Sequence, residues 1–145
     1  MTAKSKIVSI GELIQAKIAA IDGASAAVFD LVPDFTLAQV TTLKIIVSPQ
    51  SYARGNKGAA SRENPDEIVK INIAVMKKCS AKTDIPGMLL LTEQIAKGIE
   101  RQTVSDADTT GLVLSVDFEP IYDAGLFRQT KIFISVCTAT VKVIR

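Results

Sequence analysis

Hydrophobic and polar residues alternate over two long segments at the C-terminal end of the chain. Between Gly111 and Glu119 the alternation has the period of a half-buried strand. One face of this strand holds Leu112, Leu114, Val116 and Phe118, and the other holds Val113, Ser115, Asp117 and Glu119. From Thr130 to Ile144 the chain is rich in β-branched residues and is largely apolar on both faces. The two segments predict a C-terminal β-hairpin joined by a short polar turn.

The length of the last strand sets a constraint on its surroundings. At about 3.3 Å per residue it extends roughly 50 Å, whereas a compact chain of this length has a radius of gyration of about 15 Å. We therefore expect the strand to bend or to contact sister copies. Because both of its faces are apolar, we also expect each face to be covered.

Two helices are predicted from apolar residues at spacings of three and four. The first begins near Ser9, where Ser9 and Glu12 form an S-x-x-E capping box, and ends at Gly23. Its apolar stripe consists of Ile10, Leu13, Ile14, Ile18 and Ile21. The second runs from about Asp84, a candidate cap, to Arg101, with Pro86 in its first turn. Its stripe consists of Ile85, Met88, Leu89, Ile95 and Ile99.

The remaining strand patterns lie between these helices. A short strand precedes Pro33, a longer one runs over residues 40–47 and is closed by Pro49, and a third runs over residues 67–79. Residues 48–67 are too long for a hairpin turn and predict a long flexible loop. The order of elements predicts one α+β domain over residues 1–145, with two helices packed on a largely antiparallel sheet.

Composition narrows the classes of function. The chain has 145 residues, 48% hydrophobic and 22% charged, and no apolar run near the roughly 20 residues that span a bilayer, which predicts a soluble protein with no membrane partner. The N-terminus has no secretory leader pattern, so we expect synthesis in the cytoplasm. The absence of histidine excludes imidazole ligands and histidine-dependent catalysis. Cys79 and Cys137 lie in apolar strands and are expected to be buried, and no metal or cofactor is predicted.

Two short patterns carry candidate chemistry. Asp117 and Glu119 share a strand face and could act as an acid-base pair, although a solvated or intersubunit charged face is the more common use of such a pair. Residues 54–58 read R-G-N-K-G and contain the G-x-x-G of the KH nucleic-acid module. This basic loop, extended to residues 51–62, leaves open a small nucleic-acid-binding module, whose binding would weaken steeply with salt.

The C-terminal hairpin resembles that of a known family. The run D-F-E-P-I-Y-D at residues 117–123, then Leu126, Phe127 and the strand K-I-F-I-S-V-C-T-A-T-V-K-V, are similar to the closing hairpin of bacteriophage tail terminator and head-tail joining (neck) proteins. The similarity is at residue level from about Val116 to Val141, and the order of elements agrees over the whole chain.

This resemblance implies a structural role without catalysis. Members form a six-membered ring in the virion that caps the tail tube and joins it to the head, so the implied partners are sister copies, the tail tube protein and the head-tail connector or stopper protein. The ring also allows transient contact with passing DNA. Another ring of the neck is the alternative within the family. The contact residues expected on this basis are Tyr122, Asp123 and Arg128 at the hairpin tip and Tyr52, Arg54, Lys57 and Arg62 in the loop.

Overall fold

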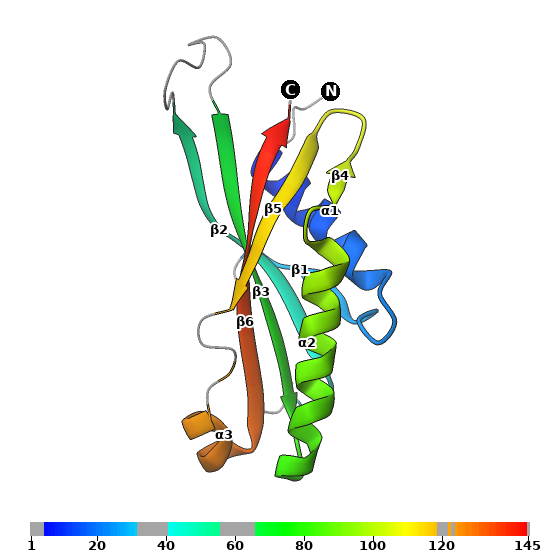
Figure 1. The fold of residues 1–145 in the computed structure, drawn as a ribbon, viewed down its shortest axis with the longest axis vertical. Helices are drawn as coiled ribbons and strands as arrows, with labels where there is room; N and C mark the ends of the chain where they lie inside the picture. The colour runs from blue at the N-terminus through cyan, green and yellow to red at the C-terminus, as the bar shows by residue number, and fades with distance from the viewer. Residues whose placement is uncertain (1–4, 32–40, 56–65, 119–121, 123, 145) are drawn as a thin grey trace.

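A six-stranded sheet runs along the length of the molecule in the computed structural model (Figure 1), with the strand order β1-β2-β3-β6-β5-β4. The structure describes residues 5–31, 41–55, 66–118, 122 and 124–144. The strands are β1 (Ala27–Phe29), β2 (Lys44–Gly55), β3 (Asp66–Lys78), β4 (Thr103–Ser105), β5 (Thr110–Phe118) and β6 (Ile132–Ile144). Only β1 and β2 pair in parallel, and the other pairs are antiparallel. The predicted α+β fold with a largely antiparallel sheet is confirmed.

Two long helices cover one face of this sheet, which we call the inner face (Figure 1). They are α1 (Lys6–Ala19) and α2 (Ile85–Ile99), and the 3-10 turn η2 (Lys82–Asp84) precedes α2. The predicted stripes face the core: Ile10, Ile14 and Ile18 of α1 are fully buried, as are Ile71 and Ile73 of β3. Removing each such isoleucine from water contributes about 1.5–3 kcal/mol. None of the helices in the described residues is long and apolar enough to cross a membrane.

Helix α1 begins one turn earlier than predicted. Ser9 lies inside the helix, is buried, and donates its backbone N–H to the Ser5 carbonyl oxygen at 2.9 Å. The predicted capping box at Ser9 and Glu12 is therefore wrong. The additional turn packs Ile7 against the core, which a helix beginning at Ser9 would not do. The helix also ends earlier than predicted, at Ala19 with Ala20 as its C-cap, and Gly23, with the left-handed φ of +84° that favours glycine, lies in the turn that follows.

Strand β2 continues through Pro49, which was predicted to close it. The register shifts between Pro49 and Ser51, so a β-bulge follows the proline. Because β1 pairs only with residues 45–47, Pro49 lies on an edge of the described sheet, where a residue without an N–H is tolerated. Residues 48–55 and 66–67 of the predicted loop are thus strand, and residues 56–65 lie outside the described part.

A second bulge changes which side chains of β5 face the core. Val113 opposes Val141 and Ser115 opposes Thr140, so Leu114 is the extra residue. Up to the bulge the predicted face is wrong: Val113 is fully buried, and Leu114 is 41% exposed. A one-residue insertion exchanges the two faces of a strand, and beyond it Val116 and Phe118 do pack against the core as predicted.

Strand β6 lies in the middle of the sheet, between β3 and β5. From Cys137 to Val143 its backbone is paired on both sides within the chain, so this half does not need the strand from a sister copy that was expected, whereas residues 132–136 pair in the described sheet with β3 alone. Its inner face is buried, whereas Val136 and Ile144 on the outer face are each 42% exposed. The connection from β5, predicted as a short polar turn, contains a further helix, α3 (Ala124–Thr130).

Two glycines in the long helices provide a matched test of this packing. A Cβ on Gly11 would collide with the Phe29 ring, so we expect Gly11→Ala to destabilise the protein by about 1–3 kcal/mol despite the better helix propensity of alanine. A Cβ on Gly87 would meet nothing within 4 Å, so Gly87→Ala should be neutral or stabilising by up to about 1 kcal/mol. Urea unfolding of both variants measures the difference, and equal effects would contradict the packing of α1 on β1.

Candidate assembly interface

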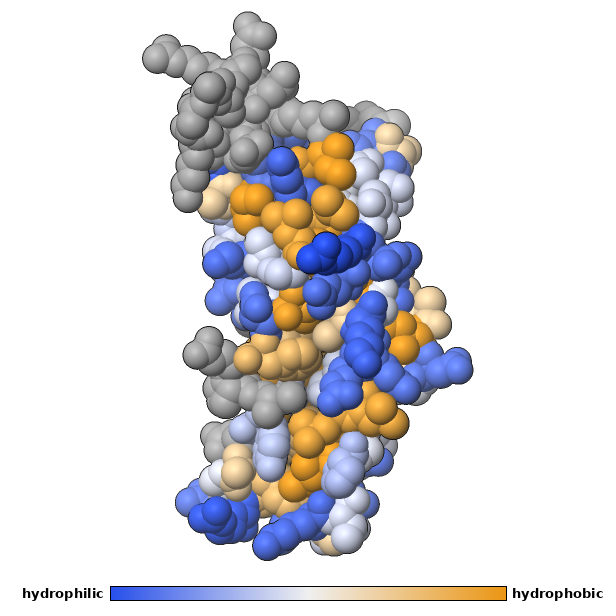
Figure 2. Space-filling view, viewed as in Figure 1, coloured by the Kyte–Doolittle hydropathy of each residue, from blue (hydrophilic) through white to orange (hydrophobic). Residues whose placement is uncertain are grey.

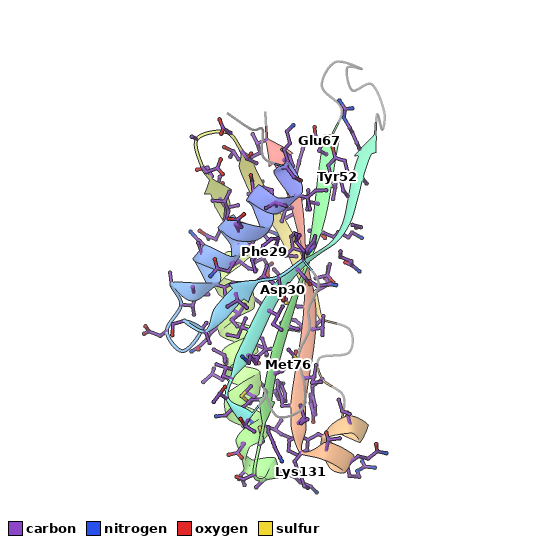
Figure 3. The ribbon with its side chains drawn as sticks, turned by 180° about the vertical axis from the view of Figure 1, so that it is seen from behind. Phe29, Asp30, Tyr52, Glu67, Met76 and Lys131 are labelled. Carbon is purple, nitrogen blue, oxygen red and sulfur yellow. The ribbon has the colours of Figure 1, made fainter. Side chains whose placement is uncertain are left out.

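The residues predicted to contact partners lie at opposite ends of the sheet. Tyr52 and Arg54 are on β2, close to the end where both chain termini lie, which we call the upper end (Figure 1; Tyr52 is labelled in Figure 3). Tyr122 and Arg128 belong to the connection around α3 at the lower end. Lys57, Arg62 and Asp123 lie outside the described residues. The predicted loop and hairpin-tip contacts are thus two separate surfaces.

At the upper end, the buried carboxylate of Glu67 binds two cations from other elements. The alternation of β3 places Glu67 on the inner face, and its side chain is only 2% exposed. The first residue of α1, Lys6, donates from Nζ to the two carboxylate oxygens at 3.3 and 3.5 Å. Arg54 lies opposite Glu67 in the β2–β3 register, with its Nε 4.0 Å from the carboxylate. A buried charge needs such partners, so this cluster ties α1 to the end of the β2–β3 pair.

A hollow of about 480 Å³ opens beside this cluster. It is lined by Ser5, Lys6, Ile7, Tyr52, Arg54 and Glu67. Tyrosine and arginine are enriched where proteins contact one another, and Tyr52 is 41% exposed here. The structure therefore brings two of the predicted contact residues together and adds Lys6 and Glu67, which sequence reasoning missed. The sequence did contain a signal for Glu67. It stands two residues before Val69, so the alternation of β3 places its carboxylate on the same face as the apolar side chains.

Removing one cation tests whether the Glu67 cluster stabilises the fold. Because Lys6 is 42% exposed and Arg54 remains nearby, we expect Lys6→Met to lower the free energy of unfolding by about 1–2 kcal/mol. Adding Glu67→Gln removes the undercompensated charge, so the double variant should be more stable than Lys6→Met alone. Lys97→Met, on the exposed side of α2, is the control and should change stability by less than about 0.5 kcal/mol. Strictly additive effects of the two substitutions would contradict the pairing.

At the lower end, Tyr122 packs within its own chain. Its ring stacks on Phe133, with the centroids 5.6 Å apart, and it contacts the core. Arg128 is exposed on α3. The α3–β6 junction is held by Lys131, which has a φ of 61° and whose carbonyl oxygen accepts the N–H of Cys79 at 2.7 Å. Of the two described tip residues, Arg128 is therefore exposed and Tyr122 is partly buried against its own chain.

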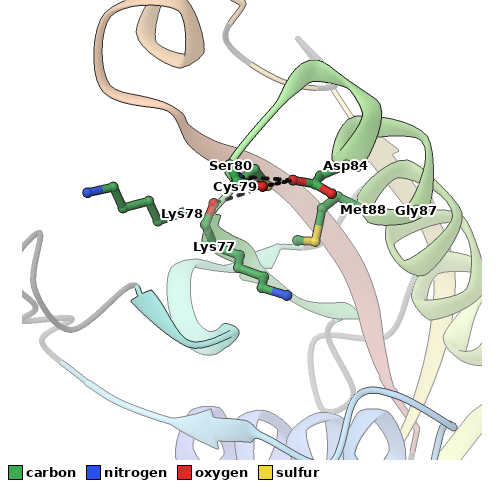
Figure 4. A pocket seen from close by; sticks show the side chains of 7 residues that line it. All are labelled: Lys77, Lys78, Cys79, Ser80, Asp84, Gly87 and Met88. Carbon is green, nitrogen blue, oxygen red and sulfur yellow. Dashed lines mark hydrogen bonds between the residues drawn. The ribbon is translucent and has the colours of Figure 1, made fainter.

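A second hollow, of about 450 Å³, lies between the end of β3 and the start of α2 (Figure 4). It is lined by Lys77, Lys78, Cys79, Ser80, Asp84, Gly87 and Met88. Asp84 is the residue before α2, as predicted, but its carboxylate accepts the backbone N–H groups of Ser80 and Ala81 at 3.0 and 3.2 Å and not those of the helix. Hydrogen bonds from Ala81 and then Ser80 hold the pKa of Asp84 below its usual value. Asp84 is therefore a charged structural group and a poor proton donor.

Both thiols are unsuited to nucleophilic chemistry. Burial raises the pKa of Cys79, with a further increase from the nearby Asp84, and burial raises the pKa of Cys137 to about 12. Cys79 is only 4% exposed and Cys137 only 2%. The prediction that both cysteines are buried small hydrophobes is confirmed. Since the thiolate is the reactive species, neither sulfur is a nucleophile at neutral pH.

Thiol titration provides a direct check. In the native protein at pH 8 we expect both cysteines to react with a disulfide reagent at least about 100-fold more slowly than a free thiol, because burial blocks access and disfavours the thiolate. In denaturant both should react at once. Rapid modification of either cysteine in the folded protein would show that its strand opens readily.

The carboxylate proposed for acid-base chemistry lies away from both hollows. Asp117 is exposed on the outer face, where Ser115 Oγ donates to it at 3.5 Å. It is in register with Thr138, which donates to Asn72 at 3.2 Å, so its neighbours form a polar row across the sheet. Glu119 lies outside the described residues. Within the described ranges no three potential metal-binding side chains come together.

The fold of this chain is similar to that of proteins of known structure. No family model and no curated protein matches the sequence. A chain from the virion of a native gene transfer agent (GTA) particle has a similar structure, with a TM-score of 0.59 and 12% identity over 97% of this chain and 98% of that one. A second solved chain, whose name states no activity, matches with a TM-score of 0.59 and 7% identity over 99% of this chain and 98% of its own. At these identities the likeness shows a shared fold along nearly the whole chain.

Proposed function

We propose that this chain is a structural subunit of a phage-like virion, with no catalytic role, that forms a ring at the end of the tail tube and joins the tube to the head. The observation that carries the proposal is the shared fold with the GTA virion chain, which extends over 97% of this chain. The resemblance of the C-terminal hairpin to tail terminator proteins supports the finer role. In this role the protein is made in the cytoplasm of a bacterial host and resides in the virion.

A ring of identical subunits needs two different contact surfaces on each copy, since head-to-tail contacts close into a ring. Exposed apolar side chains occur at the edge strand β1 and on the outer face of β5 and β6. Val28 and Leu31, at β1, are 50% and 58% exposed, and we call them the β1 patch. Leu114 and Val136 are 41% and 42% exposed, and we call them the β5–β6 patch. Strand β4 pairs only with residues 110–112 of β5, so in the described sheet it does not extend over the bulge at Leu114.

The upper end of the sheet then remains for other virion proteins. In our proposal the hollow with Tyr52 and Arg54 at that end contacts a neighbour in the particle. The tail tube protein and the head-tail connector or stopper protein are the two neighbours that this role requires. A different ring of the neck is the alternative, and sedimentation with purified tail tubes or with connector rings distinguishes the two positions.

The ring interface can be tested with one variant on each patch. We expect the wild-type protein to show concentration-dependent association in multi-angle light scattering, up to a ring that the family resemblance implies to be hexameric. Val28→Asp/Leu31→Asp and Leu114→Asp should each remain monomeric, because a buried unpaired carboxylate costs more than the contact provides. An equimolar mixture of the two variants should form dimers and nothing larger, because each retains one intact patch.

The control is Leu90→Asp, which places the same charge on α2 at a leucine that is 54% exposed. It should assemble like the wild type. A wild-type protein that stays monomeric at every concentration, also with tail tubes present, would sink the proposal. Variants that fail to complement each other in the mixture would show a symmetric contact between identical patches, which does not build a ring.

A further inference from the structure

The lower end of the sheet gathers cations from segments far apart in the sequence. We call this surface the basic end, and it consists of Lys44, Lys77, Lys78, Lys82, Arg128 and Lys131. Strand register places them at one end of the sheet: Lys78 opposes Ile132, the residue after Lys131, and Lys44 opposes Met76, the residue before Lys77. Lys77 and Lys78 are successive residues of β3, so their side chains point away from each other (Figure 4) and carry the charge to both faces of this end. The hydrogen bond from the Cys79 N–H to the Lys131 carbonyl oxygen connects the residue after β3 to the residue before β6 at the same end. Lys131 is labelled there in Figure 3.

The basic end has little compensating negative charge. In the described segments 43–46, 76–84 and 124–133 the one carboxylate is Asp84, and its side chain is bonded to Ser80 and Ala81. The whole chain carries a net charge of only +2, so the rest of the chain is net acidic. The five cations other than Lys44 are exposed, and Figure 2 shows hydrophilic side chains at the lower edge of the molecule, as elsewhere on this face. The charge is therefore concentrated at one end of the molecule.

The composition of the basic end favours a polyanion over an acidic protein. Five of its six cations are lysines, which bind phosphate as mobile point charges without the fixed bidentate geometry of arginine, and this suits a contact that does not read sequence. Those three described segments contain none of the large apolar side chains that are exposed on the surface. A protein interface usually depends on such anchors, but a phosphate-backbone contact does not.

We infer that the basic end binds the phosphate backbone of duplex DNA, without reading its sequence. This surface is at the opposite end of the sheet from Tyr52 and Arg54, so it is a different site from the one that the sequence suggested. The inference does not depend on ring formation, because a single subunit already presents all of its cations.

Binding of a short fluorescently labelled DNA duplex, followed by anisotropy over a salt series, tests the inference. We expect the logarithm of the binding constant to fall linearly with the logarithm of salt concentration, with a slope of about −3 to −5 for roughly four or five phosphates contacted. Duplexes of different sequence should bind equally. Lys77→Gln/Lys78→Gln/Lys82→Gln should bind at least about 10-fold more weakly at low salt and reduce the slope by about 2–3.

A charge-matched control separates this site from a general effect of net charge. Lys17→Gln/Lys70→Gln/Lys97→Gln removes the same charge elsewhere and should change the affinity less than about twofold, with both variants folded by circular dichroism. Equal weakening by the two triple variants would overturn the inference, as would the absence of binding at low salt. So would loss of binding in Arg54→Gln/Lys57→Gln/Arg62→Gln alone, which would assign the contact to the loop.

Two further readouts distinguish the ligand and the role. If polyglutamate of equal charge displaces the duplex as effectively as unlabelled DNA, the basic end recognises an acidic protein surface and the inference is wrong. Light scattering on the Lys77→Gln/Lys78→Gln/Lys82→Gln variant should show unchanged association. A protein that binds duplex through this end but never assembles would refute the ring and leave the DNA site standing.

Discussion

The fold depends on the long antiparallel pairing of β3 with β6, which runs from Glu67 opposite Val143 to Lys78 opposite Ile132. Both strands bury their inner faces, and that apolar surface must be covered, which places α1 and α2 on one side of the sheet. Because this pair runs nearly the length of the molecule, its two ends form two distinct surfaces. The buried carboxylate of Glu67 lies at one end, and the lysines that finish β3 lie at the other.

The two bulges decide what the sheet presents at its edges. At Leu114 an extra residue turns a leucine outward and lets Val116 return to the core, and after Pro49 a similar irregularity lets β2 continue past a residue that cannot donate a hydrogen bond. Both positions lie on strands only partly covered by the short β1 and β4. Bulges and proline discourage unspecific pairing of strand edges. Association through side-chain patches is therefore a better fit to this sheet than extension of the sheet from copy to copy.

Charge is distributed differently at the two ends of the sheet. At the upper end, Lys6 and Arg54 are occupied by Glu67, and that charge serves the packing of α1. At the lower end the cations exceed the carboxylates and remain accessible to solvent. A fold with cations paired to a buried carboxylate at one end and accessible cations at the other can bind protein neighbours through one surface and a polyanion through another. No catalytic group is needed for either task.

The sequence by itself determined the elements whose apolar periodicity is regular: the stripes of α1 and α2, the alternation of β3, the existence of the long strand β6, and burial of both cysteines. It did not predict β4 or α3, which are too short to show a period, or the bulges, which shift a strand by one residue without changing its composition. Only the tertiary structure decided that β6 is a central strand, that Glu67 meets Lys6, and that Lys44, Lys78 and Arg128 share one end. Those facts depend on which distant segments become neighbours, and periodicity along a chain carries no information about that.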